Sequence, residues 1–123
     1  MKLSNLRISS ALNISGQSGV YANQKFNIDD IVLCLSGKIL PLPTRTSIQI
    51  DNENHIEDDV GHYINHNCNP TCRIDGYNVV AIKEVGESDE ITYDYSQNED
   101  RLASPFVCSC CNKLITGRAN NEI

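Results

Sequence analysis

The apolar residues of this chain come in short runs, and each run is closed by polar or turn-forming residues. Few stretches show the i, i+3, i+4 spacing of an amphipathic helix, so the pattern favours strands. The strands that we expect cover residues 6–8, 18–22, 31–35, 46–50, 77–81 and 90–92. Asp75-Gly76 is the strongest hairpin signal, and helix is expected only as a turn or two near residues 60–64. The sequence therefore predicts a mainly β fold of short strands with little helix.

Length and charge limit the function classes. A chain of 123 residues, of which 40% are hydrophobic, can fill one modest core. The excess of 16 Asp and Glu over 10 Lys and Arg gives a net charge of -6. This charge disfavours direct binding to nucleic acid and would suit a basic protein partner. The same excess is also an ordinary way to keep a protein in solution.

The sequence predicts neither a membrane segment nor a cleaved signal. No stretch approaches the ~20 apolar residues that cross a bilayer, and the N-terminus lacks the apolar centre of a signal peptide. We therefore expect a soluble protein of a reducing intracellular compartment, in its own cell or inside a host cell. Three disulfides in a secreted domain are then less favoured than metal ligation or free thiols for the cysteines. These are Cys34, Cys68, Cys72, Cys108, Cys110 and Cys111.

The densest group of polar and reactive side chains lies in residues 63–72, where amides, an imidazole, two thiols and a proline occur together. Such density suits a polar pocket. An ordinary loop, in which asparagine side chains cap their own turns and His66 faces solvent, is an alternative. A metal site built on His66 is a poorer one, because a single cysteine two residues later lacks the paired spacing of zinc fingers.

A second unusual segment is Glu90-Ile91-Thr92-Tyr93-Asp94-Tyr95. If it stays extended, Tyr93 and Tyr95 lie on one face, because strand side chains repeat every two residues. Two phenols would then line one surface. Alternating tyrosines are also a normal way to cover a sheet.

Taken together, these segments resemble those of the SET-domain protein lysine methyltransferases. The matching features are Asn65-His66-Asn67-Cys68-Asn69-Pro70, a following hairpin, the segment ending at Tyr95, and then Cys108-Ser109-Cys110. Upstream, Gly16-Gln17-Ser18-Gly19-Val20-Tyr21-Ala22 is similar to the family's strand that approaches the cofactor. The resemblance implies a β-clip type SET fold, in which small sheets are joined by a pseudoknot. It also implies a SET domain in residues 1–100 and a post-SET-like cysteine tail in residues 101–123.

The resemblance further implies S-adenosylmethionine as the methyl donor and a lysine of a basic, histone-like protein segment as the acceptor. By position, Tyr95 is the catalytic tyrosine. Tyr93 stands where the family has Phe or Tyr, and its hydroxyl favours mono-methylation because it leaves less room for an already methylated amine. The residues implied to lie beside the cofactor are Gln17, Ser18, Gly19, Tyr63, Asn65, His66, Phe106 and Ser109. Small family members can dimerise to complete the lysine channel, so a homodimer stays open.

Family members with this tail bind one zinc ion through the loop cysteine and three tail cysteines. Cys68, Cys108 and Cys110 match, whereas the last position is Ile115, which cannot ligate, and Cys111 is the nearest substitute. Zinc held by these four cysteines and a tail of reduced thiols are the two alternatives.

Two other functions compete with an enzyme. Gln17 replaces a family glycine, which supports a weakened SET-fold module that binds a peptide without turnover. A small zinc-stapled interaction protein, unrelated to methylation, is the third interpretation.

Overall fold

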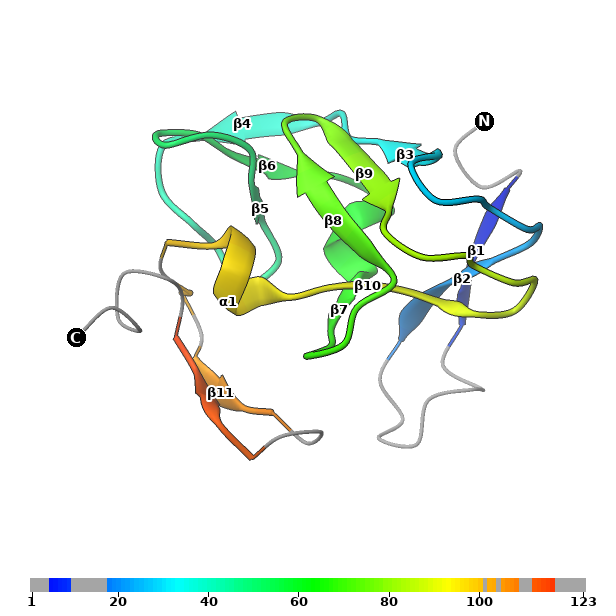
Figure 1. Cartoon of the computed structure of the whole chain (residues 1–123). Helices are drawn as coiled ribbons and strands as arrows, with labels where there is room; N and C mark the ends of the chain where they lie inside the picture. Colours follow the sequence, from blue (N-terminus) through cyan, green and yellow to red (C-terminus); the bar gives the residue numbers. More distant parts are fainter. Residues whose placement is uncertain (1–4, 10–17, 101, 104, 109–111, 117–123) are drawn as a thin grey trace.

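The computed structural model describes residues 5–9, 18–100, 102–103, 105–108 and 112–116, and strands dominate it (Figure 1). In chain order the elements are β1 (Leu6–Ser9), β2 (Gly19–Ala22), β3 (Ile31–Cys34), β4 (Lys38–Leu40), β5 (Ile48–Gln49), β6 (His55–Glu57), the 3-10 helix η2 (Gly61–Tyr63), β7 (Asn65–His66), β8 (Cys72–Asp75), β9 (Asn78–Ala81), β10 (Glu90–Tyr93), α1 (Tyr95–Asn98), β11 (Phe106–Val107) and β12 (Leu114–Ile115). This confirms the expected mainly β fold of short strands in small sheets. Across the described ranges, no helix has the length and apolar character that a membrane span requires.

One four-stranded sheet, in the order β1-β2-β10-β7, carries Gly19, Asn65, His66 and Tyr93. Strand β2 pairs antiparallel with both β1 and β10, whereas β7 pairs parallel with β10. All of β2 is buried, as is Ile91 of β10. A parallel pair needs a long connection between its strands, and residues 67–89 supply it here. The sheet therefore brings the Asn65–His66 segment beside the end of β10.

Two three-stranded sheets, β3-β9-β8 and β4-β6-β5, complete the body. Strands β8 and β9 form the hairpin predicted at Asp75-Gly76, with Asp75 paired to Asn78. Gly76 has a φ of +58°, a left-handed conformation that glycine takes without the steric cost of a Cβ atom. The predicted hairpin is thus confirmed, and the left-handed conformation of Gly76 explains why glycine stands at its turn.

A single apolar cluster joins these sheets. It unites Ile48 and Ile56 of the β4-β6-β5 sheet with Val79 of β9 and Ile91 of β10. Ile64, directly before β7, is 2% exposed and belongs to the same cluster. Removing such side chains from water is the main favourable term in folding, so the approach to β7 is anchored in the core.

The sequence pattern does not predict β4, β6, β7, β11 or β12, because two or three residues hold too few alternations to detect, and β8 is also outside the expected strands. The strand expected at 46–50 is shortened to Ile48–Gln49. Thr44 and Ser47 close a turn just before it, where each side-chain oxygen accepts the other residue's N–H, at 2.8 and 3.1 Å. The expected helical turn near 60–64 is present as η2.

Candidate active site

The site lies where β7 runs beside the end of β10. Asn65 pairs with Thr92 and His66 with Tyr93, and the Asn67 N–H donates to the Tyr93 carbonyl at 3.3 Å. Backbone pairing therefore sets the distance between the Asn-His segment and the tyrosine segment. We call this pair of strands, with α1, the crossing.

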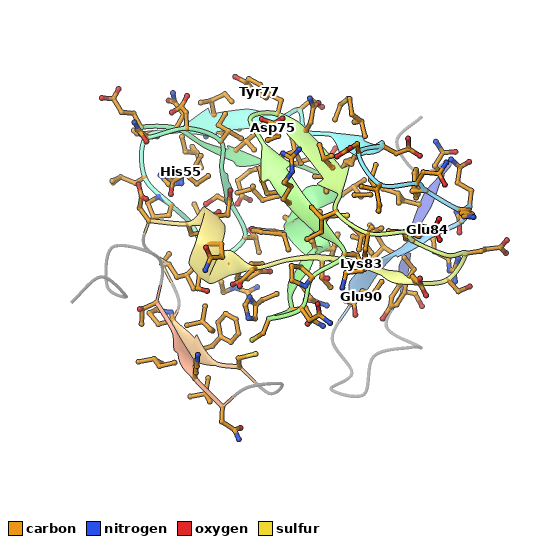
Figure 2. The ribbon with its side chains drawn as sticks, viewed as in Figure 1. His55, Asp75, Tyr77, Lys83, Glu84 and Glu90 are labelled. Carbon is orange, nitrogen blue, oxygen red and sulfur yellow. The ribbon has the colours of Figure 1, made fainter. Side chains whose placement is uncertain are left out.

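The Asn65 amide is fixed by two bonds within the protein. Its Nδ2 donates to the Ser18 carbonyl at 3.0 Å and to Oε2 of Glu90 at 2.9 Å; Figure 2 marks Glu90 at the start of β10. Gly19 makes room for this contact, because a Cβ atom there would lie 2.6 Å from Glu90 Oε2. With both amide hydrogens bound, the amide orientation is set, and Oδ1 is left as an acceptor for a ligand.

The His66 ring is enclosed, with 2% of its side chain exposed. Its Nδ1 accepts the Tyr95 N–H at 3.0 Å, and its Nε2 lies 3.5 Å from the Cys68 Sγ. A neutral imidazole has one acceptor nitrogen and one N–H. The bond from Tyr95 therefore assigns the proton to Nε2.

Tyr93 and Tyr95 lie together, with ring centroids 4.7 Å apart. They are not on one continuous strand, because β10 ends at Tyr93 and α1 begins at Tyr95. The Tyr95 hydroxyl donates to the Ile64 carbonyl. Burial, and after it the charge of Glu99, raises the pKa of both phenols. Both therefore keep their protons at neutral pH.

The sequence interpretation missed Glu99, a buried carboxylate that follows α1. Its side chain is 1% exposed, and its Oε2 accepts the Gln49 N–H at 2.8 Å and Nδ2 of Asn98 at 2.6 Å. No pattern marks Glu99 in a polar stretch of the sequence, because its burial depends on β5 packing over it. Glu99 shares a pocket with both tyrosines; the other lining residues are Thr44, Arg45, Thr46, Ser47, Gly61, His62, Ile64 and Leu102.

The tail reaches the crossing through an aromatic ring. Phe106 stands edge-on to His66 and to Tyr95, with centroids 5.7 and 5.9 Å apart, a favourable aromatic arrangement. Phe106 pairs with Ile115 in the antiparallel β11–β12 ribbon, and Ile115 is buried. Ile115 is therefore a packing residue at the position where the family has a zinc ligand.

The remaining residues implied by the resemblance are less close or lie elsewhere. Tyr63 is in η2, and its ring lies 4.0 Å from that of His62 rather than among Tyr93, Tyr95 and Phe106. Gln17, Ser109, Cys110 and Cys111 lie outside the described residues.

A thiol pair links the tail to the loop after β7. The Sγ atoms of Cys68 and Cys108 are 3.4 Å apart. His66 completes a group whose possible ligand atoms all lie within 4.8 Å of one another. However, Nε2 of His66 carries the proton while Nδ1 accepts from Tyr95, so His66 does not fit as a ligand in this arrangement. The two thiols fit half of a four-cysteine zinc site.

Cys72, a further thiol near the loop, does not fit a metal site. It is 1% exposed within the core, and burial raises its pKa to about 11. Its side chain belongs to the apolar core cluster, so this cysteine is better explained as a packing residue.

The model of the SET domain matches residues 16–96, which is 81 of the 123 residues. The chain belongs to the SET-domain family. The match spans the Asn65–His66 segment and ends one residue after Tyr95, so it contains the whole crossing up to the first turn of α1.

This SET-domain chain also resembles a protein of Plasmodium falciparum (isolate 3D7) named "Putative histone-lysine N-methyltransferase 1". The two are 29% identical over 83 residues, which cover 56% of this chain and 1% of the relative. The chain thus matches a very small part of that protein.

Proposed function

We propose that this SET-domain protein is an S-adenosylmethionine-dependent protein-lysine N-methyltransferase acting on a basic, histone-like segment. The observation that carries the proposal is the Tyr95 hydroxyl, which donates to the Ile64 carbonyl at a pocket next to the Asn65 segment. A lysine entering that pocket would meet a protonated phenol and a main-chain oxygen in fixed positions. Such preorganisation is how a protein lowers the barrier of a two-reactant step.

The cofactor side of the proposed site is built around Asn65. The Oδ1 acceptor of its amide suits an ammonium group, which S-adenosylmethionine carries on its amino-acid portion. Gly19 supports this arrangement, since its missing Cβ atom leaves room for Glu90 Oε2 beside the Asn65 amide. The proposed cofactor contacts are Gln17, Ser18, Gly19, Tyr63, Asn65, the main chain of His66, Ser109 and the ring of Phe106.

The methyl donor would supply an electrophilic methyl group on a positively charged sulfur. A free lysine keeps its proton up to a pH of about 10.4, so the acceptor must first lose that proton to solvent. A partly buried pocket beside a positive charge lowers the pKa of the amine, because both effects disfavour its charged form. The lysine nitrogen would then form the C–N bond with this methyl group, and the C–S electron pair would leave with the sulfur.

In this proposal Tyr95 orients the amine and does not act as the base. Its raised pKa keeps the phenol protonated, and its proton is already donated to the Ile64 carbonyl. The hydroxyl oxygen retains lone pairs that can accept a hydrogen bond from the amine. Tyr93, whose ring is 3% exposed, would limit the room for a methylated amine and so favour mono-methylation.

Zinc is the proposed staple of the tail, held by Cys68, Cys108, Cys110 and Cys111. The 3.4 Å separation of the first two sulfur atoms is compatible with a shared metal. A metal ion would order a ribbon too small to have a core of its own. Reduced thiols without metal remain the alternative, and elemental analysis of the purified protein decides between the two.

The proposal is tested by incubating the protein with radiolabelled S-adenosylmethionine and mixed core histones. Label should appear on lysine with the unaltered protein and fall to background with Tyr95→Phe. Binding of cofactor and basic peptide without transfer would favour the weakened peptide-binding module instead. If neither the cofactor nor the peptide raises the melting temperature, and the purified protein contains zinc, the interaction protein would be favoured.

A further inference from the structure

We propose that the His66 side chain is a positioning residue, which holds the backbone of Tyr95 through its Nδ1 atom. The inference rests on the proposed function, in which Tyr95 is the catalytic residue. It concerns a side chain that the family resemblance assigned to the cofactor, and it assigns that side chain a different role.

The Tyr95 N–H stands at the start of α1. The first N–H groups of a helix have no partner within it. Asp94 caps α1 and accepts the Ser96 N–H at 2.9 Å. The Tyr95 N–H is instead bound at 3.0 Å by His66, which is far away in sequence. The turn that separates Tyr93 from Tyr95 is thus closed by a tertiary contact.

The His66 ring is enclosed by protein groups. His66 packs edge-on against two aromatic rings, with centroids 5.3 Å from Tyr95 and 5.7 Å from Phe106. Its second nitrogen faces the Cys68 sulfur. With both nitrogens turned to protein atoms and 2% of the side chain exposed, the ring has no edge left for a cofactor. A cofactor contact at this position would have to come from the main chain.

Loss of the His66 ring would disturb the position of Tyr95. Without an acceptor at Nδ1, the Tyr95 N–H is left unsatisfied in a partly buried turn. The start of α1 would shift to find another partner, and the Tyr95 hydroxyl would move with it. Small displacements of this kind lower the rate of a step that depends on orientation. Asn65 is held by different bonds, so cofactor affinity should change little.

The test compares two substitutions at the same position. In His66→Asn, the side-chain oxygen stands in the place of Nδ1 and can accept the Tyr95 N–H, whereas His66→Leu offers no acceptor. We expect His66→Leu to lower kcat roughly 10-fold or more, from the cost of an unsatisfied N–H. We expect His66→Asn to recover most of that loss, with the cofactor Kd of both variants within about 2-fold of the unaltered protein. Equal losses of kcat in both variants, or a cofactor Kd that weakens in step with kcat, would overturn the proposal.

A spectroscopic measurement separates this proposal from the proposed function. Nitrogen NMR of the full chain should show an unprotonated Nδ1 and a protonated Nε2 for His66. The Tyr95 amide should be protected from hydrogen exchange in the unaltered protein and in His66→Asn, but not in His66→Leu. The opposite tautomer, or an unprotected Tyr95 amide in the unaltered protein, refutes the positioning role. Absence of methyl transfer with both signals present would refute only the proposed function.

Discussion

Two regions wall the candidate active site, and they are held by different means. The crossing of β7 and β10 is tied by backbone pairing and by Thr71. The Thr71 hydroxyl donates to the Glu90 carbonyl at 2.9 Å and accepts the Thr92 N–H at 3.0 Å. The β11–β12 ribbon has two residues in each strand and reaches the crossing through the Phe106 ring and the Cys108 thiol. Figure 1 shows β11 set apart from the three body sheets, beyond α1.

This contrast separates two kinds of sensitivity. Backbone pairs survive most side-chain substitutions, so changes in the crossing should act through the chemistry of the replaced group. The ribbon has a small core and depends on a few side-chain contacts. Changes in the ribbon should therefore displace all of the ribbon's contacts with the site, including the Phe106 ring. If the proposed function holds, the crossing controls the rate of transfer, and the tail controls cofactor affinity.

The largest effect should come from Tyr95→Phe in the crossing. Loss of the orienting hydroxyl is expected to lower kcat about 100-fold or more, with the cofactor Kd changed by less than about 2-fold. Single-turnover kinetics and calorimetry measure the two quantities. Tyr77→Phe is the matched control, because Tyr77 is 54% exposed at the β8–β9 turn (Figure 2) and should have no effect. A parallel loss of affinity and rate would show that the two regions are not separable.

In the tail, Cys108→Ser should lower the affinity for the cofactor rather than the rate of transfer. We expect the cofactor Kd to rise roughly 10-fold, as when residues that support a binding site are lost. The kcat at saturating cofactor should change little. Cys34→Ser, at the exposed end of β3, is the control. If zinc is the staple, a chelator should reproduce the effect of Cys108→Ser and leave that variant unchanged. A loss of kcat with unaltered affinity would contradict the assigned role of the tail.

The buried phenols of the crossing should make stability depend on alkaline pH. Their pKa values are raised, chiefly by burial, above the unfolded value of about 10. Above that pH the unfolded chain loses protons that the folded chain keeps, so the free energy of unfolding falls. Each such tyrosine contributes about 1.4 kcal/mol per pH unit. The free energy of unfolding, measured in urea between about pH 9 and pH 11, should fall less steeply with pH for Tyr93→Phe than for the unaltered protein or Tyr77→Phe. Identical slopes would mean that Tyr93 ionises freely in the folded state.

The smallest effect expected is a change of product in Tyr93→Phe. Removing this hydroxyl should allow further methylation, raising the share of di- and tri-methyl lysine a few-fold, in keeping with about 1 kcal/mol for one hydrogen bond. Mass spectrometry of a methylated peptide at equal turnover gives the ratio. Predominant tri-methylation by the unaltered protein would refute the role given to Tyr93.

The sequence predicted much of this protein through local chemistry. Short apolar runs predicted the strands that became β1, β2, β3, β9 and β10, and Asp75-Gly76 predicted the hairpin. The Asn65–His66 and Tyr93–Tyr95 segments carried the family resemblance, which the match over residues 16–96 bears out. These features are local because backbone conformation and side-chain alternation are set by neighbouring residues.

Only the tertiary structure decided what surrounds those segments. The parallel pairing of β7 with β10 depends on a connection of many residues, and a two-residue strand has no pattern of its own. The bond from Tyr95 to His66 and the burial of Glu99 join groups that are distant in sequence. Such contacts are fixed by packing and by the need to satisfy buried polar groups. The types of residue at the site could therefore be predicted from the sequence, whereas the tautomer of His66 and the raised pKa of Tyr95 required the fold.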